Sequence, residues 1–197
     1  MIIDALDKIV QLKIVYFGPA MSGKTTSLKA LFNHFGKKDD VNSVESTVGR
    51  TLFFDYGIIN FQNDNWKLKI HVYTTTGQDF YIVTRPITLR AIDGIIFVAD
   101  SQKNAYERNV ISWNELASYF DDHLIEIPKV LAFNKQDIME KFRIALFLNE
   151  IDFHLLRNVN ITKTIALNGE GILESFEKAL SLVFKELYGS QFLYALT

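Results

Sequence analysis

The chain has 197 residues, 48% of them hydrophobic, which is enough to bury one sizeable core without disulfides or a structural metal. It contains no cysteine, which excludes disulfides, thiolate zinc sites, a cysteine nucleophile, prenylation and palmitoylation. The formal net charge of −2 provides no basic field, so nucleic acid is not an expected partner.

The first residues of the sequence do not have the pattern of a targeting segment. Asp4 and Asp7 are acidic where a secretory signal peptide requires basic residues, and Ile2 stands where myristoylation requires glycine. No apolar run approaches the ~18 residues that a membrane-spanning helix needs. We therefore expect a cytoplasmic protein without a transmembrane segment or lipid anchor.

The first half of the chain alternates apolar runs with amphipathic stretches. Leu12–Phe17 is apolar and ends at a glycine, which predicts a strand, and the helix after it is expected over Thr25–Phe35. Thr51–Phe61 and Trp66–Tyr73 are predicted strands, and the polar turn Gln62–Asn65 between them indicates a hairpin.

The second half continues this alternation. Gly94–Ala99 is apolar throughout, which is typical of a strand buried on both faces. The remaining predicted elements are, in chain order, a helix over Asn104–Phe120, a strand over Lys129–Phe133, a helix around Glu140–Asn149, a strand near Ile161–Leu167 and a helix over about Ile172–Leu187. The last helix has the clearest 3.6-residue period, and its apolar face is expected to pack in the core.

These elements predict an α/β fold of three layers. A doubly wound, mostly parallel sheet with one antiparallel hairpin strand has helices on both of its faces. Because no linker, repeat or low-complexity segment divides the sequence, we expect residues 1–197 to form a single domain with a core over about residues 10–190.

A phosphate-binding loop is the strongest motif. Gly18–Thr25 matches G-x-x-x-x-G-K-[ST] between a predicted strand and a predicted helix. Its two glycines let the backbone curve into a ring of N–H groups around phosphates, and the helix adds the positive end of its dipole. Lys24 supplies a charge for the β- and γ-phosphates, and the Thr25 hydroxyl is a ligand for Mg²⁺. The predicted phosphate site comprises Gly18, Pro19, Ala20, Met21, Ser22, Gly23, Lys24, Thr25 and Thr26.

The tetrapeptide Asn134-Lys135-Gln136-Asp137 predicts that the base is guanine. The Asp137 carboxylate can accept hydrogen bonds from guanine N1–H and N2–H₂, which adenine lacks, and an unpaired buried polar group costs about 1–3 kcal/mol. Asn134 is expected to hold neighbouring loops together, and Lys135 to lie along the face of the base. GTP or GDP, rather than ATP, is the expected ligand.

Four segments share a more specific pattern: Gly18–Thr25, Arg50–Asp55, Tyr73–Tyr81 and Asp93–Gln102. With these segments the chain resembles the MglA family, the Ras-like small GTPases of bacteria and archaea named for gliding motility and cell polarity. The resemblance extends over roughly residues 10–190. It implies the small GTPase type of the phosphate-loop nucleoside triphosphatase fold, with Mg²⁺ as cofactor.

The resemblance also implies roles for residues near the γ-phosphate. Gln78 matches the glutamine that orients the attacking water, and Arg50 matches an arginine that acts in cis on the transferring phosphoryl group. Thr51 and Gly77 mark the two switch segments, and Thr51 is an expected ligand of Mg²⁺. The second switch offers two alternatives to Arg50, namely Arg85 and Arg90.

Three further positions bear on the site. Thr74 takes the place of the usual D-x-x-G aspartate, as in MglA-like proteins, and is expected to hold a metal-bound water without adding charge. Ala20 stands where glycine is usual, and its Cβ is expected to crowd the catalytic side chains and slow hydrolysis. Ala166 and Leu167 lie where the family has a loop whose backbone N–H reads guanine O6.

Two classes of function remain open. The first is an enzyme that hydrolyses GTP to GDP and acts as a molecular switch in polarity, motility or related regulation. For it the resemblance implies switch-dependent effectors and a Roadblock/LC7 regulator of the MglB type. The second is a regulatory module that binds GTP or GDP with negligible hydrolysis, which Ala20 and Thr74 favour and Gln78 and Arg50 disfavour.

Overall fold

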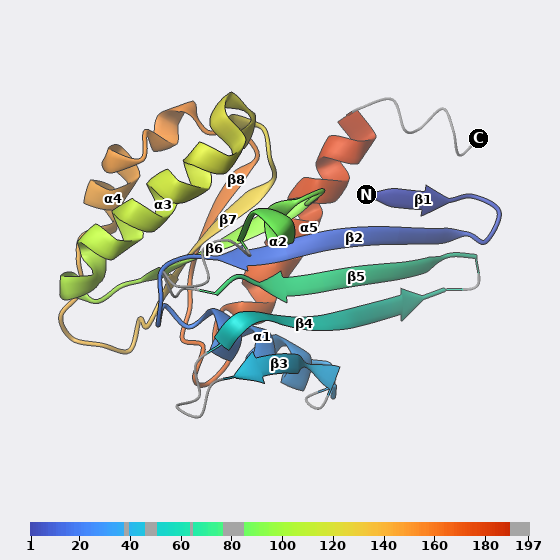
Figure 1. Ribbon diagram of the computed structural model, residues 1–197, viewed down its shortest axis with the longest axis horizontal. Helices are drawn as coiled ribbons and strands as arrows, with labels where there is room; N and C mark the ends of the chain where they lie inside the picture. Colours follow the sequence, from blue (N-terminus) through green and yellow to red (C-terminus); the bar gives the residue numbers. More distant parts are fainter. Residues whose placement is uncertain (38–39, 46–50, 64, 77–84, 190–197) are drawn as a thin grey trace.

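An eight-stranded sheet organises the part of the chain that the computed structural model describes, namely residues 1–37, 40–45, 51–63, 65–76 and 85–189 (Figure 1). Its strands are β1 (Ile2–Asp4), β2 (Ile9–Phe17), β3 (Asn42–Glu45), β4 (Thr51–Gln62), β5 (Lys67–Thr74), β6 (Gly94–Asp100), β7 (Lys129–Asn134) and β8 (Val159–Lys163). The strand order is β3-β4-β5-β2-β6-β7-β8, and β1 pairs with β2 outside this path.

The sheet combines a parallel part with an antiparallel part. Strand β2 pairs in parallel with β5 and β6, and β6, β7 and β8 continue the parallel order. Strands β4 and β5 form the predicted antiparallel hairpin. Two more antiparallel strands, β1 and β3, join β2 and β4. With three and four residues, these strands are too short to show a period in the sequence.

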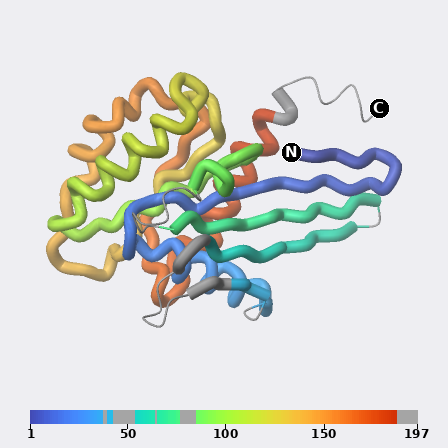
Figure 2. Tube along the Cα trace, viewed as in Figure 1, coloured from blue at the N-terminus to red at the C-terminus, as the bar shows by residue number. Residues whose placement is uncertain are grey.

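Helices cover both faces of the sheet, which confirms the predicted three-layer α/β fold. The α-helices are α1 (Lys24–His34), α2 (Arg85–Leu89), α3 (Tyr106–Phe120), α4 (Ile144–Glu150) and α5 (Ile172–Gly189), and 3₁₀ turns cover Lys103–Ala105, Asp121–Ile125 and Phe153–Leu155. Figure 1 shows α3 and α4 on one side of the parallel strands and α5 on the other. The far ends of β1, β2, β4 and β5 extend past the helices (Figure 2).

Alternating residues of the central strands separate two cores. In β6, Ile96 and Val98 belong to the core beneath α1 and α5, while Ile95 and Phe97 belong to the core beneath α3 and α4. All seven residues of β6 are buried, as the continuous apolar run predicted. On α5, Phe176 and the other buried members of its apolar face lie in the first of these cores.

Local hydrogen bonds shift two predicted boundaries. Strand β8 ends at Lys163, because the next residues turn back: the Ile165 N–H donates to Glu170 O. Helix α4 begins only at Ile144, because the Phe142 N–H donates to the carbonyl of Ser101 and holds the preceding segment against the end of β6.

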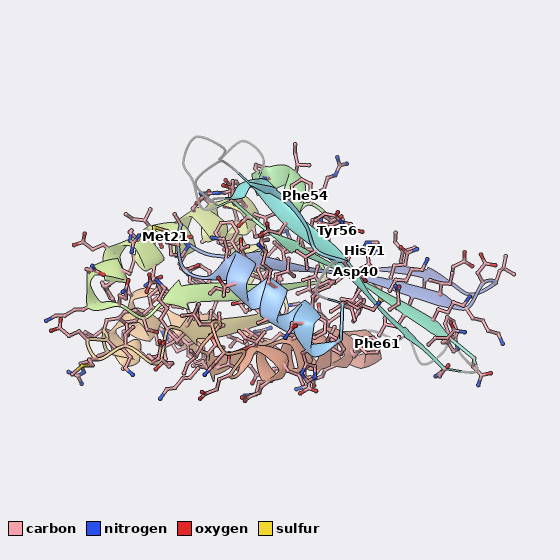
Figure 3. The ribbon with its side chains drawn as sticks, turned by 90° about the horizontal axis from the view of Figure 1, so that it is seen from below. Met21, Asp40, Phe54, Tyr56, Phe61 and His71 are labelled. Atoms are coloured by element: carbon pink, nitrogen blue, oxygen red, sulfur yellow. The ribbon has the colours of Figure 1, made fainter. Side chains whose placement is uncertain are left out.

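Part of the sheet is lined with aromatic and polar side chains on the face opposite α1. The Tyr56 hydroxyl of β4 and His71 Nδ1 of β5 share a 2.8 Å hydrogen bond, and the two rings are stacked (Figure 3). Burial and two nearby lysines lower the pKa of His71. The ring of Tyr56 also lies 4.5 Å from that of Tyr73. Tyr56 therefore points to this face.

Within the described residues, the helices offer no segment with the length and apolar character to cross a membrane.

Candidate functional site

The loop between β2 and α1 has the backbone geometry of a phosphate cradle. Gly18 has φ +144°, and a Cβ there would lie 2.3 Å from the Val98 carbonyl oxygen. Gly23 has φ +103°, and its Cβ would lie 2.2 Å from Asn134 Nδ2. Both positions therefore require glycine for conformation and for space. Met21, between them, also has a positive φ of 61° and is 68% exposed at the rim (Figure 3).

Helix α1 begins in this loop with an uncapped N-terminus. Gly23 is its N-cap and forms no side-chain capping bond, and the helical ladder starts with Ser27 N–H donating to Gly23 O at 2.8 Å. Thr25 and Thr26 lie in the first turn, whose N–H groups have no intrahelical acceptor. The partial positive charge of this end suits an anion.

Lys24 is buried at the mouth of the loop. Its ammonium group donates to the Gly18 and Pro19 carbonyl oxygens, both at 2.8 Å. Burial, and then the Arg85 guanidinium, lower the pKa of Lys24 to about 7, against the opposing effect of Asp55. A buried ammonium that donates to carbonyl oxygens gains strongly from an incoming polyanion.

Thr25 of the loop contacts a carboxylate that the sequence analysis did not assign to the site. Thr25 Oγ1 donates to Asp55 Oδ2 at 2.5 Å, and Thr74 Oγ1 donates to the same oxygen at 2.7 Å. The Asp55 N–H in turn donates to Thr74 Oγ1 at 2.9 Å, and the Asp55 side chain is fully buried. Three oxygen-bearing side chains from α1, β4 and β5 therefore meet at one point.

Thr74 lies next to a negative charge that the sequence analysis did not assign to the site. Thr74 itself is neutral, but β4 brings Asp55 to it from nineteen residues earlier in the chain. The sequence pattern that could have indicated this role is the alternation of β4, which places Asp55 on the face opposite to Tyr56. A single acidic residue within a strand does not reveal which strand lies beside it.

Asn134 connects the phosphate loop to the other end of the site. Its Nδ2 donates to Ser22 O at 2.8 Å, and its Oδ1 accepts from Thr164 Oγ1 at 3.1 Å and from Ala166 N–H at 2.9 Å. Asn134 is 2% exposed at the end of β7. The structure thus places Asn134 between the loop that begins with Gly18 and the loop after β8.

The two charged residues that follow Asn134 have different surroundings. Lys135 has φ +64°, and its ammonium group lies 2.7 Å from Asp100 Oδ2. Asp137 is exposed, and its carboxylate has no hydrogen-bond or ionic partner among the residues that the structure describes. Asp137 is therefore available to a ligand, whereas Lys135 is already held by the end of β6.

The loop after β8 brings backbone donors to the same edge. The Ala166 N–H is used by Asn134, while Leu167 is 85% exposed and its N–H has no acceptor in the described part of the chain. A hollow of about 390 Å³ separates this loop from α1 and is lined by both of these residues and by Thr26.

The second switch is described only at its two ends. Arg85, at the start of α2, is 5% exposed, donates from Nε to Thr76 O at 2.9 Å and pairs with Glu115 of α3. These bonds argue against Arg85 as the alternative catalytic arginine. Gly77, Gln78 and Arg50 lie outside the described residues, and Thr51 is placed by its backbone at the start of β4.

Comparison with known proteins places this geometry in a family. The chain matches the ADP-ribosylation factor family over residues 2–183. It is 32% identical over 184 residues to the mutual gliding-motility protein MglA of Myxococcus xanthus, covering 90% of this chain and 93% of that protein. The chain is an MglA-type small GTPase.

More distant small GTPases align over a similar span. The GTP-binding protein ypt3 of Schizosaccharomyces pombe is 25% identical over 88% of this chain and 76% of its own length. The Ras-related protein RABD2a of Arabidopsis thaliana is 26% identical over 91% and 82%, respectively.

Small GTPases generally bind GTP or GDP together with Mg²⁺, and the donor set of this MglA-type chain suits that ion. Thr25, Thr74 and Asp55 offer hard oxygen atoms, which Mg²⁺ prefers, and the carboxylate supplies one negative charge. When bound, this ion would supply positive charge that stabilises the negative phosphates.

Proposed function

We propose that this MglA-type GTPase binds GTP and GDP with Mg²⁺, hydrolyses GTP, and switches partners according to the nucleotide. The proposal rests above all on the bond from Asn134 Nδ2 to Ser22 O, which joins a phosphate cradle to a guanine motif. Residues 1–197 act in this proposal as one domain.

The phosphates would lie in the loop over Gly18–Thr25. The backbone N–H groups of the loop and of Thr26 surround them, and Lys24 exchanges its two carbonyl partners for phosphate oxygens. Burial lowers the pKa of Lys24 in the ligand-free protein, and the bound polyanion would raise it again and so favour the protonated side chain.

Mg²⁺ would be held by the Thr25 hydroxyl and, in the GTP form, by Thr51. Asp55 would act on it through water together with Thr74, since both side chains already hydrogen-bond each other beside Thr25. In this proposal Asp55 carries the charge that the aspartate of D-x-x-G supplies elsewhere.

The guanine base would lie against the Lys135 stem with its N1–H and N2–H₂ on the Asp137 carboxylate. The Leu167 N–H, free in the described structure, is the donor for O6, whereas the neighbouring Ala166 N–H already bonds Asn134 and positions this loop. Adenine would leave the Asp137 carboxylate unpaired, which gives the selectivity against ATP.

Hydrolysis is assigned to Gln78, which orients the attacking water, and Arg50, which neutralises charge on the transferring phosphoryl group. Gly77 is the backbone donor expected at the γ-phosphate. Ala20 replaces a glycine beside these groups and slows the reaction without preventing binding, because the cradle uses backbone N–H groups.

The switch would act through β4. Asp55 of this strand points to the nucleotide end, while the adjacent Tyr56 points to the outer face beside Tyr73. A displacement of β4 at the phosphates therefore changes the surface that partners meet. We propose a Roadblock/LC7 regulator of the MglB type and a role in motility or polarity in the cytoplasm, in line with the name of the Myxococcus xanthus relative.

Calorimetry on nucleotide-free protein with Mg²⁺ tests the binding part of the proposal. GDP and GTP are expected to bind, and ATP at equal concentration is expected not to displace them. Absence of binding by both guanine nucleotides would reject the proposed function.

Single-turnover hydrolysis of pre-bound GTP separates an enzyme from a binding module. We expect Gln78→Leu and Arg50→Ala each to slow hydrolysis, while GDP binding persists. A rate that neither substitution changes, with or without a regulator, would favour the module with negligible hydrolysis.

A further inference from the structure

The end of strand β6 carries a buried carboxylate that the proposed nucleotide contacts do not use. Asp100 is the register partner of Asn134 in the β6–β7 ladder, and its side chain is 1% exposed. Its Oδ2 lies 2.7 Å from Lys135 Nζ. The parallel arrangement of β6 and β7 thus sets this carboxylate beside the guanine motif, although 35 positions separate the two residues in sequence.

Asp100 is held firmly by groups other than Lys135. The Asn109 side chain of α3 binds both backbone polar groups of Asp100: it accepts from the N–H at 2.9 Å and donates to the carbonyl oxygen at 2.8 Å. The Gln102 N–H donates to Asp100 Oδ1 at 3.1 Å. With its backbone clamped and one carboxylate oxygen bound, Asp100 presents the other oxygen to Lys135 in a fixed position.

We propose that Asp100 is a positioning residue for the guanine base, because it anchors the Lys135 ammonium and so aligns the lysine stem with the face of the base. This inference rests on the proposed guanine nucleotide site. A free lysine side chain samples many rotamers, and nucleotide binding would otherwise have to remove that entropy. Anchoring the side chain before the nucleotide arrives reduces that cost.

A second cation near Asp100 does not take this role. Arg108 Nη2 lies 3.7 Å from Asp100 Oδ2, and the Arg108 side chain is 44% exposed. At this distance and exposure the pair is weak. Arg108→Gln is accordingly expected to leave nucleotide affinity within about twofold of the wild type.

A double-mutant cycle on GDP affinity, measured by calorimetry with Mg²⁺, tests the inference. Asp100→Asn and Lys135→Met are each expected to weaken GDP binding about 10-fold, which corresponds to about 1.4 kcal/mol. Both changes abolish the same aligned lysine: Asp100→Asn releases it, and Lys135→Met removes its ammonium group. The double variant is therefore expected to bind GDP no more weakly than either single variant.

Asp93→Asn is the matched control, since Asp93 precedes the other end of β6 and accepts a backbone bond from Lys13 N–H at 2.8 Å. GDP affinity of this variant is expected to equal that of the wild type. Additive effects of Asp100→Asn and Lys135→Met, which indicate a merely structural Asp100, would overturn the inference, as would wild-type affinity in Asp100→Asn.

Each outcome separates the inference from the proposed function. If the wild type itself fails to bind GDP, the proposed function is wrong. If the wild type binds GDP and the cycle shows no coupling, only the role of Asp100 is wrong. If circular dichroism shows that Asp100→Asn does not fold, Lys135→Met is compared with Asp100→Glu, which keeps a carboxylate at this position. Unchanged GDP affinity in Lys135→Met overturns the inference. A 10-fold loss of affinity in Lys135→Met that Asp100→Glu does not cause supports it.

Discussion

The two ends of the candidate site are built in different ways. At the end proposed to bind the base, here called the base end, Asn134 and Asp100 are register partners on adjacent parallel strands. The phosphate loop follows strand β2, which belongs to the same parallel part of the sheet. At the end proposed to bind Mg²⁺, here called the metal end, Thr25 and Thr74 hydrogen-bond Asp55, which belongs to the antiparallel strand β4.

This difference bears on how each end responds to a ligand. The base end is fixed by a buried network in which the Asn134 side chain joins the phosphate loop to the loop after β8. The metal end depends on the placement of one strand, β4, whose next residue, Tyr56, belongs to the outer face. We infer that the base end gives selectivity, while the metal end reports the state of the phosphates.

The largest expected effect lies at the base end. Asp137→Asn is expected to weaken GTP and GDP binding about 100-fold, because two hydrogen bonds to a carboxylate are lost at roughly 1.5 kcal/mol each. Binding of xanthine nucleotides is expected to improve, since the pairing pattern at the base edge is reversed. Competition between GDP and xanthosine diphosphate measures both changes, and unaltered preference for GDP would contradict the assignment of Asp137.

Gly23→Ala is expected to damage both ends at once. An added Cβ would lie 2.2 Å from Asn134 Nδ2 at a φ of +103°, so unfolding by urea should show a loss of about 2–3 kcal/mol. Gly36→Ala is the control, because Gly36 also has a positive φ, +67°, while no described atom beyond its chain neighbours lies within 4 Å of an added Cβ. Equal losses in the two variants would show that Asn134 does not constrain the loop.

Asp55→Asn is expected to act on the metal end alone. The amide oxygen can still accept from Thr25 and Thr74, so folding should persist, but the charge is lost. GDP affinity in Mg²⁺ should fall about 10-fold, as expected for one charged hydrogen-bonding group. In excess chelator the variant and the wild type should converge, and a tenfold difference that persists there would contradict a role through the metal.

Over a single pH unit, the smallest expected effect is a pH dependence of stability at Lys24. Its pKa of about 7 in the folded ligand-free chain means that, between pH 7 and the ordinary lysine range, the unfolded chain binds one more proton. Stability should therefore rise with pH in this window, by at most ~1.4 kcal/mol per pH unit. Lys24→Met should remove this slope, and bound GDP should suppress it in the wild type. Identical slopes in wild type and Lys24→Met would reject the lowered pKa.

Strand and helix periodicity predicted most of the fold. The apolar run of β6, the hairpin of β4 and β5, and the amphipathic face of α5 follow from local patterns, and the structure has each of them. The short strands β1 and β3 escaped prediction because each has at most four residues and forms only by pairing with a longer neighbour. Helix α2, with five residues, is likewise too short to show a helical period in the sequence.

By itself, the sequence determined the family and predicts the phosphate loop and the guanine tetrapeptide, because each of these is a contiguous motif whose spacing carries its chemistry. The tertiary structure decided that Asp55 reaches Thr25 and that Asp100 reaches Lys135, each across at least thirty positions of sequence. Such partners depend on strand order and register, which are set by the packing of the whole sheet and leave no local pattern.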